Sequence, residues 1–141
     1  SEHNLQPDQD LRVIQSWILP RAQGLTPRYG SFSADDTTLD RRLNQWFHLV
    51  SDMEGTGQVK IHQDFNLFAS EINAGDSIEF GLLPSRQAYV LCLEGTLMVE
   101  DLKLQKHEAA EIQSTSESTR HVFQGLKGEE QTHLLFYEMG G

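Results

Sequence analysis

The sequence is poor in basic residues, in cysteine and in long apolar runs. It holds 11 Lys and Arg against 21 Asp and Glu, which gives a formal net charge of -10. A negative surplus of this size argues against direct binding to nucleic acid or to an anionic membrane surface. No apolar stretch approaches the ~20 residues of a membrane span, and residues 1–4 lack the basic and apolar character of a signal peptide. We therefore expect a cytoplasmic protein without direct contact to nucleic acid or membrane.

The one cysteine, Cys92, lies within the apolar run 88–93. A cysteine in such a run is typical of a small buried side chain, and a single cysteine cannot form a disulfide within the chain. This pattern favours a reducing compartment.

Helical periodicity is equally scarce. Residues 34–43, with Asp35 and Asp36 near their start and Arg41 and Arg42 near their end, carry the charge order that suits a helix dipole. We predict a short connecting helix or an irregular linker here.

Short runs of β-branched and aromatic residues, separated by turn residues, dominate the chain from residue 45 onward. Many short strands at even spacing predict an all-β jelly roll, in which two sheets fold face to face. A chain of 141 residues suits one such domain with its own core. The predicted strands are 45–50, 58–61, 66–72, 77–82, 88–93, 96–100, 109–112, 120–123 and 132–137.

Residues 11–19 form a separate, strongly apolar run that ends at Pro20. We predict a strand here. A long connection separates it from the barrel, so that Trp17 and Ile18 need another surface against which to pack. Unpaired apolar strands recruit other chains. The sequence therefore predicts a homo-oligomer, with exchanged strands as one way to form it.

Four motifs follow one another along the chain: Ser-Glu-His-Asn at 1–4, Gln-Ser-Trp-Ile-Leu-Pro at 15–20, Gly-Leu-Thr-Pro-Arg-Tyr at 24–29 and Ile-His-Gln-Asp at 61–64. Together they resemble the pirin-like family of bicupins, and most closely its bacterial branch that includes quercetin 2,3-dioxygenases. In that family an N-terminal cupin lobe holds a metal through three histidines and a glutamate, and the C-terminal lobe has lost its site.

The resemblance implies a division of this chain. Residues 1–30 would be the tail of the N-terminal cupin lobe, 31–44 a linker or short helix, and 45–141 a C-terminal, metal-free cupin domain. The family pattern places its metal-binding glutamate on Glu2, which would act only with the rest of the N-terminal lobe present. That lobe would hold a divalent metal such as iron, nickel or copper. No cofactor is expected in this chain itself.

The first cupin motif keeps its spacing here while losing its ligands. Between the turn glycines Gly75 and Gly95, the positions that hold metal ligands in the motif are occupied by Gly81, Leu83 and either Gln87 or Ala88. Hydrogen, aliphatic and amide groups cannot replace imidazole and carboxylate for a divalent ion. We therefore expect an empty metal site and no catalytic or cofactor-binding residue.

The second cupin motif gives the same result. His107 stands at its turn glycine and Ala110 at its ligand position. A question of register stays open in the first motif. Ile78 and Leu82 alternate with Gly81, so burial favours the former as the inward set, whereas the ligand frame expects 81 and 83 to point inward.

The candidate pocket residues are His62, Asp64 and Glu79. His62 and Asp64 would share a strand face, with the carboxylate fixing the imidazole tautomer of a pocket base. The alternative is a hydrogen-bonded structural histidine, which we favour for His62. Glu79 would line a cavity with Gly81.

Two further histidines, His121 and His133, could face each other across adjacent strands, but two imidazoles alone make a poor metal site.

Three functions remain open. The resemblance implies a metal-free lobe with a structural or assembly role beside a catalytic quercetin 2,3-dioxygenase lobe, and this chain alone is then expected to be inactive. The second is a protein-binding regulatory module, for which the apolar run 11–19 is the gripping surface. The third is a non-catalytic cupin that binds a small molecule in the vacated pocket.

Overall fold

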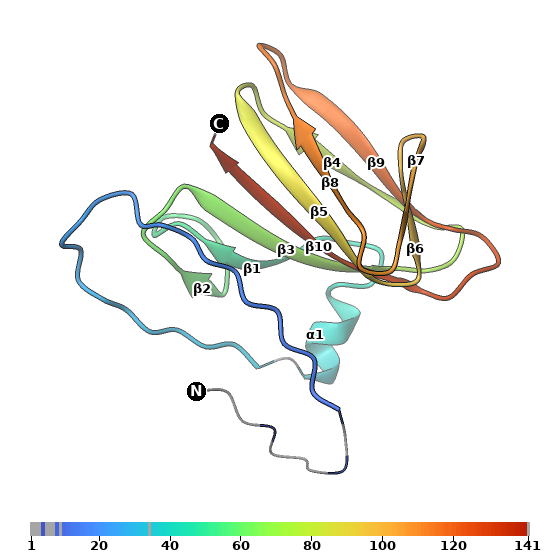
Figure 1. Cartoon of the computed structure of the whole chain (residues 1–141), viewed down its shortest axis with the longest axis horizontal. Helices are drawn as coiled ribbons and strands as arrows, with labels where there is room; N and C mark the ends of the chain where they lie inside the picture. The colour runs from blue at the N-terminus through green and yellow to red at the C-terminus, as the bar shows by residue number, and fades with distance from the viewer. Residues whose placement is uncertain (1–3, 5–7, 9, 34, 141) are drawn as a thin grey trace.

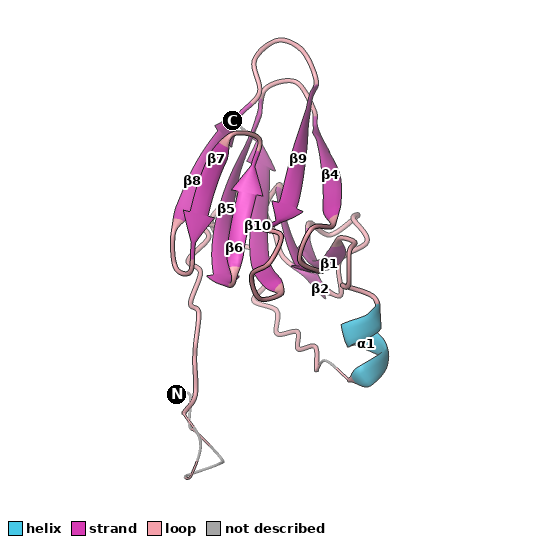
Figure 2. Ribbon diagram, turned by 90° about the vertical axis from the view of Figure 1, so that its right-hand side faces the viewer, coloured by secondary structure: helices cyan, strands magenta, loops and turns pink. Residues whose placement is uncertain are grey.

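The structure is a computed structural model that describes residues 4, 8, 10–33 and 35–140. Within these residues the chain forms a sandwich of two sheets that face each other (Figures 1 and 2). The larger sheet has the order β2-β1-β3-β10-β5-β8 and the smaller sheet the order β4-β9-β6-β7. No helix among these residues is long and apolar enough to cross a membrane.

The elements are α1 (Asp36–Asp40), β1 (Phe47–Ser51), β2 (Val59–Lys60), β3 (Phe65–Ile72), β4 (Ser77–Leu82), β5 (Arg86–Glu94), β6 (Thr96–Val99), β7 (Leu102–Gln105), β8 (Ala109–Gln113), β9 (Thr119–Gly125) and β10 (Thr132–Gly140). The prediction of an all-β sandwich is confirmed, and each strand predicted from residue 45 onward matches an observed strand to within a few residues.

One strand was missed. β7 is short and carries exposed residues on both sides of buried Leu104, so its apolar alternation is weak. It pairs with β6 in an antiparallel hairpin, and Glu100, with φ 50°, helps to form the tight turn between the two strands.

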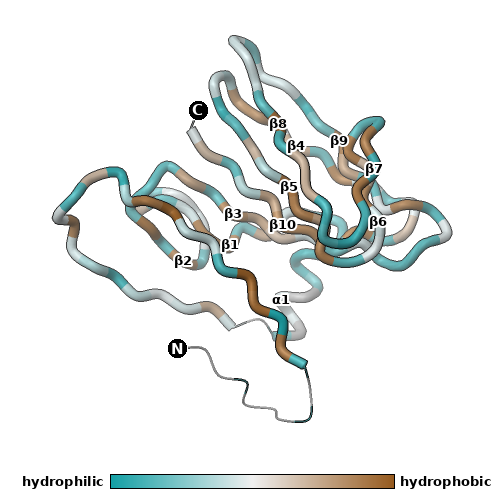
Figure 3. The backbone as a smooth tube through the Cα atoms, viewed as in Figure 1, coloured by the Kyte–Doolittle hydropathy of each residue, from teal (hydrophilic) through white to brown (hydrophobic). Residues whose placement is uncertain are grey.

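The strand predicted over 11–19 is wrong. This segment has no regular secondary structure, and it crosses the outer face of the larger sheet instead of pairing along a sheet edge (Figure 1). Its apolar side chains therefore stay accessible, most of all Trp17 at 92% and Leu19 at 84% exposure. Figure 3 shows these apolar stretches along the N-terminal segment.

The helix predicted over 34–43 is shorter, at Asp36–Asp40. Asp35 caps its start, because its Oδ1 accepts a hydrogen bond from the Thr38 backbone N–H at 3.0 Å. The helix stops early because the chain then joins the larger sheet. Leu43 bridges to Glu71, and Asn44 adopts φ 52°.

The space between the sheets is filled by apolar side chains. Trp46 is partly buried and packs against this core. Its ring packs edge-on against Phe80 and Phe123, and its Nε1 donates to the Glu79 carbonyl at 2.8 Å, which ties it to the opposite sheet. Cys92 is fully buried, as predicted, and burial raises the pKa of its thiol. The fully buried side chains of the core include Ile72, Leu82, Val90, Leu97, Phe123 and Leu134.

The open question of register on β4 is answered by burial. Ile78 and Leu82 point into the core at 7% and 0% exposure, whereas Leu83 is 62% exposed. Gly81 is exposed, and an added Cβ would meet no atom within 4 Å. Two of the positions that match the ligands of the first cupin motif, Gly81 and Leu83, therefore face outward, whereas Ala88 is buried in the core at 2% exposure.

Candidate functional site

The inner face of the larger sheet changes from apolar to polar toward the C-terminal end of β10. Phe136 faces Phe68 across the strand pair, and two residues further on Glu138 faces Asn66. Since side chains on a strand alternate between faces, Glu138 and Asn66 point into the same interior as the two phenylalanines. Arg86 at the start of β5 faces the same end, opposite Gly140.

Arg86 bridges two carboxylates at this end. Its Nη1 and Nη2 donate to Asp64 at 2.9 and 2.8 Å, and its Nη2 and Nε donate to Glu138, the former at 3.0 Å. The Glu138 side chain is buried at 8% exposure, whereas that of Asp64 is 60% exposed. The hydrogen bonds from Arg86 hold the pKa of Asp64 below its ordinary value, and both carboxylates raise the pKa of Arg86.

The chain of hydrogen bonds continues to His48. Asn66 donates from Nδ2 to Glu138 at 2.7 Å, and its Oδ1 lies 2.9 Å from His48 Nε2. Because an amide oxygen only accepts, His48 must donate from Nε2, and in the neutral ring Nδ1 then accepts from the Thr56 hydroxyl at 2.8 Å. We call His48, Asp64, Asn66, Arg86 and Glu138 the Arg86 network.

The charged and polar groups of the Arg86 network are paired with one another or, in the case of His48 Nδ1, with Thr56. Both carboxylates are paired with the guanidinium, and both nitrogens of His48 have partners. A buried carboxylate is stabilised by a cation close by, and here Arg86 supplies that positive charge to Glu138. No group of three or more His, Cys, Asp or Glu placed to hold a metal ion exists among the residues that the structure describes.

Sequence reasoning missed His48, Arg86 and Glu138. A signal was present, because His48 lies two residues after Trp46 in one predicted strand and Asn66 two residues before Phe68 in another. Polar residues that share a face with core aromatics point inward. The pairing of His48 with Phe68, whose rings stack at 4.3 Å, is visible only in the fold.

The residues predicted to line a pocket do not come together. His62 and Asp64 lie in the connection between β2 and β3, not on a shared strand face. Asp64 pairs with Arg86 and not with His62, whose Nδ1 is buried without a hydrogen-bond partner among the described residues. Glu79 is exposed and forms a surface ion pair with Arg120 at 2.9 Å.

The other histidines are equally separate. His121 lies on β9 and His133 on β10, which belong to different sheets, so they do not face each other. His121 bonds to Thr119 at 2.8 Å, and burial lowers the pKa of His133. Glu2, the expected ligand of an N-terminal metal, lies outside the described residues.

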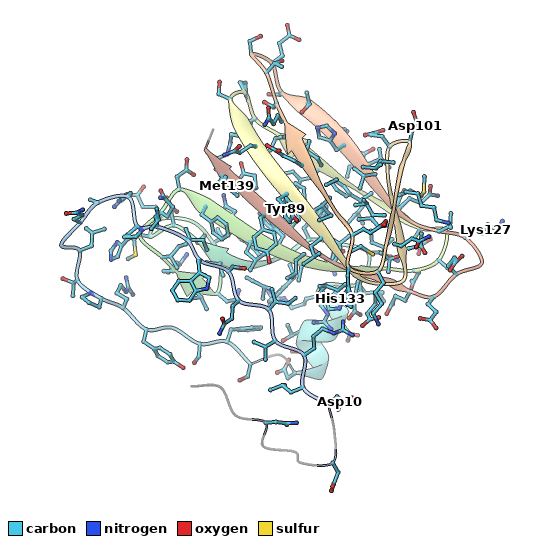
Figure 4. All side chains as sticks on the ribbon, viewed as in Figure 1. Asp10, Tyr89, Asp101, Lys127, His133 and Met139 are labelled. Carbon is cyan, nitrogen blue, oxygen red and sulfur yellow. The ribbon has the colours of Figure 1, made fainter. Side chains whose placement is uncertain are left out.

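Two grooves flank the N-terminal segment on the outer face of the larger sheet. The first, of about 820 Å³, lies between residues 16–19 and strands β5 and β10. Tyr89 and Met139, labelled in Figure 4, line it. The second, of about 550 Å³, lies between residues 16–28 and the connection 60–63. Both grooves exist because the segment touches the sheet at only a few points.

Those points are specific. Arg12 pairs with Glu94, and the Ser16 hydroxyl lies 3.2 Å from that of Tyr137. Gln63 donates to the Leu19 carbonyl at 2.7 Å. These contacts fix the path of the segment across the sheet and leave its apolar side chains exposed to solvent.

The family model of the quercetinase C-terminal cupin domain matches residues 48–139 of this chain. The chain belongs to the quercetinase C-terminal cupin family. The match covers β1 to β10, so the quercetinase C-terminal cupin domain is the sandwich that holds the Arg86 network.

Curated relatives agree. A Zymomonas mobilis protein, whose name provisionally assigns it as a quercetin 2,3-dioxygenase, is 30% identical over 111 residues that cover 78% of this chain and 46% of that protein. The quercetin 2,3-dioxygenase of Escherichia coli K12 is 24% identical over 73% of this chain and 42% of its own length. This cupin chain therefore spans about half the length of the curated relatives it matches.

Solved structures show the same fold. The bacterial pirin YhhW from Escherichia coli, in complex with nickel(II), superposes with a TM-score of 0.72 over 88% of this chain and 48% of that one, at 16% identity. The predicted cupin fold and the resemblance to pirin-like proteins are thereby confirmed.

Proposed function

We propose that this chain acts as the metal-free cupin lobe of a pirin-like protein and supports a separate lobe that binds metal and carries quercetin 2,3-dioxygenase activity. The observation that carries the proposal is the Arg86 network, in which a guanidinium occupies the polar end of the barrel interior and pairs with both carboxylates. A lobe whose internal charges are already neutralised has no need of an ion. Its contribution is then structural.

The outer face of the larger sheet is the surface that suits contact with a second lobe. The N-terminal segment lies across it with Trp17 and Leu19 exposed, beside a groove of about 820 Å³. Exposed apolar side chains gathered beside a groove are typical of an interaction surface. The metal, nickel in the related bacterial pirin, or iron or copper, would be held in the other lobe, where Glu2 would be one ligand.

Quercetin turnover tests this division of labour. The purified 141-residue chain is incubated with Ni(II), Fe(II) or Cu(II) and quercetin, and the loss of quercetin absorbance is followed. The quercetin 2,3-dioxygenase of Escherichia coli is the positive control. We expect no turnover above that of the free ions. Turnover by the chain at the rate of the control would overturn the proposal.

A second candidate is a binding module that assembles with another chain, and the exposure of Trp17 and Leu19 favours it. A homo-oligomer would bury these side chains against a second copy. Light scattering over a range of concentrations decides the point. We expect the wild type to associate and the double variant Trp17→Ser, Leu19→Ser to be monomeric, and a wild type that is monomeric throughout contradicts this candidate. A cytoplasmic location is our inference from the single, buried Cys92.

A further inference from the structure

The positive charges of this chain are unevenly paired. Although acidic residues outnumber Lys and Arg by 21 to 11, six of these 11 cations form no ion pair with a carboxylate among the described residues. Two of the six, Arg28 and Lys60, line the groove of about 550 Å³. By contrast, Arg42 pairs with Glu71 and Arg120 with Glu79.

Within the described residues, Arg28 and Lys60 contact only neutral acceptors. Arg28 donates from Nη1 to the Met53 sulfur at 3.2 Å, a weak acceptor. Lys60 donates to the Ser51 hydroxyl at 3.1 Å and to the Gly55 carbonyl. Neither charge is neutralised by these contacts, so each keeps the capacity to bind an anion.

The rest of the groove adds to this preference. Its lining contains no Asp or Glu in the described part of the chain, whereas Ile18, Leu25 and Ile61 supply an apolar wall. His62, whose buried Nδ1 has no hydrogen-bond partner in the part of the chain that the structure describes, lines the same groove. A site of this size that combines an apolar wall with a few polar groups is typical of small-molecule binding.

We propose that this groove binds a small organic anion, a carboxylate attached to an apolar body. The carboxylate pairs with Arg28 and Lys60, and the body packs against Ile18, Leu25 and Ile61. This function is separate from the proposed support of a metal-binding lobe, because the groove and the Arg86 network share no residue.

Calorimetric titration of the chain with benzoate, benzamide and inorganic phosphate tests the proposal. Benzoate has both the charge and the apolar body, benzamide lacks the charge, and phosphate lacks the apolar body. We expect saturable binding of benzoate that is at least about tenfold tighter than that of either control, since a charged hydrogen bond contributes a factor of this order.

Two variants locate the site. Arg28→Gln should weaken benzoate binding about tenfold and leave benzamide unchanged. Arg120→Gln, which removes an exposed arginine that pairs with Glu79, should leave benzoate binding unchanged. Equal binding of benzoate by wild type and Arg28→Gln, or no saturable binding of benzoate at all, overturns the proposal.

Discussion

Replacing Arg86 with methionine removes the internal cation and leaves the surrounding side chains in place. Glu138, at 8% exposure, then becomes a buried carboxylate whose remaining donor is the Asn66 amide. Loss of one partner from a buried pair costs about 3–5 kcal/mol. The lost contact with Asp64 adds little, because that side chain is 60% exposed and exposed pairs contribute about 0–1 kcal/mol. We expect Arg86→Met to lower the free energy of unfolding by about 3–5 kcal/mol.

Urea unfolding at pH 7, followed by circular dichroism, measures this loss. The matched control is the double variant Arg86→Met, Glu138→Gln, in which no unpaired charge stays buried. It should recover about 2–3 kcal/mol relative to Arg86→Met, the coupling expected for side chains in direct contact. A loss below about 1 kcal/mol in Arg86→Met, or no recovery in the double variant, would refute the assignment of Arg86 as the internal cation.

The sign of the pH dependence follows from the same contacts. Arg86 holds the pKa of Asp64 below its ordinary value of 3.8, so this stabilisation is complete above that value and is lost as the pH falls through the lowered pKa. Arg86→Met lacks this stabilisation. The difference in the free energy of unfolding between wild type and variant should therefore stay constant above pH 3.8 and narrow as the pH falls below that value.

Three further experiments test the fold. Trp46→Ala removes the ring that joins the two sheets and should lower the free energy of unfolding in urea by about 3–5 kcal/mol. The control Trp17→Ala, at a site 92% exposed, should change that free energy by less than about 0.5 kcal/mol. Equal losses in the two variants contradict the packing of Trp46. Gly95→Ala places a Cβ 2.7 Å from the Gln131 carbonyl oxygen at φ 71°, so we expect a thermal midpoint several degrees lower, and an unchanged midpoint contradicts the turn. Burial lowers the pKa of His133 below its ordinary 6.5, so stability is complete above that value and falls as the pH drops through it; an NMR titration of the ring at or above 6.5 contradicts this.

The strands of the barrel were predictable because they are buried on one side. The alternation of Ile78, Phe80 and Leu82 with exposed residues marks β4 directly. The segment 11–19 has the same apolar composition and yet forms no strand, because a strand also needs a neighbour with which to pair and the sequence does not say whether one exists.

The site was less accessible to sequence reasoning. His62 and Asp64 attracted attention because they share a motif, but Asp64 faces Arg86, a residue 22 positions away. The bond between Arg86 and Glu138 spans 52 positions. Such pairs depend on the register of β10 with β3 and β5, which composition and local pattern do not determine.

The metal content of the purified chain tests the absence of a bound ion most directly. The protein is incubated with excess Ni(II), freed of unbound ion by gel filtration, and analysed by inductively coupled plasma mass spectrometry. Because Arg86 already neutralises the buried Glu138, we predict far less than one metal per chain. One nickel retained per chain, and lost on substitution of His48 or Glu138, would contradict a metal-free lobe.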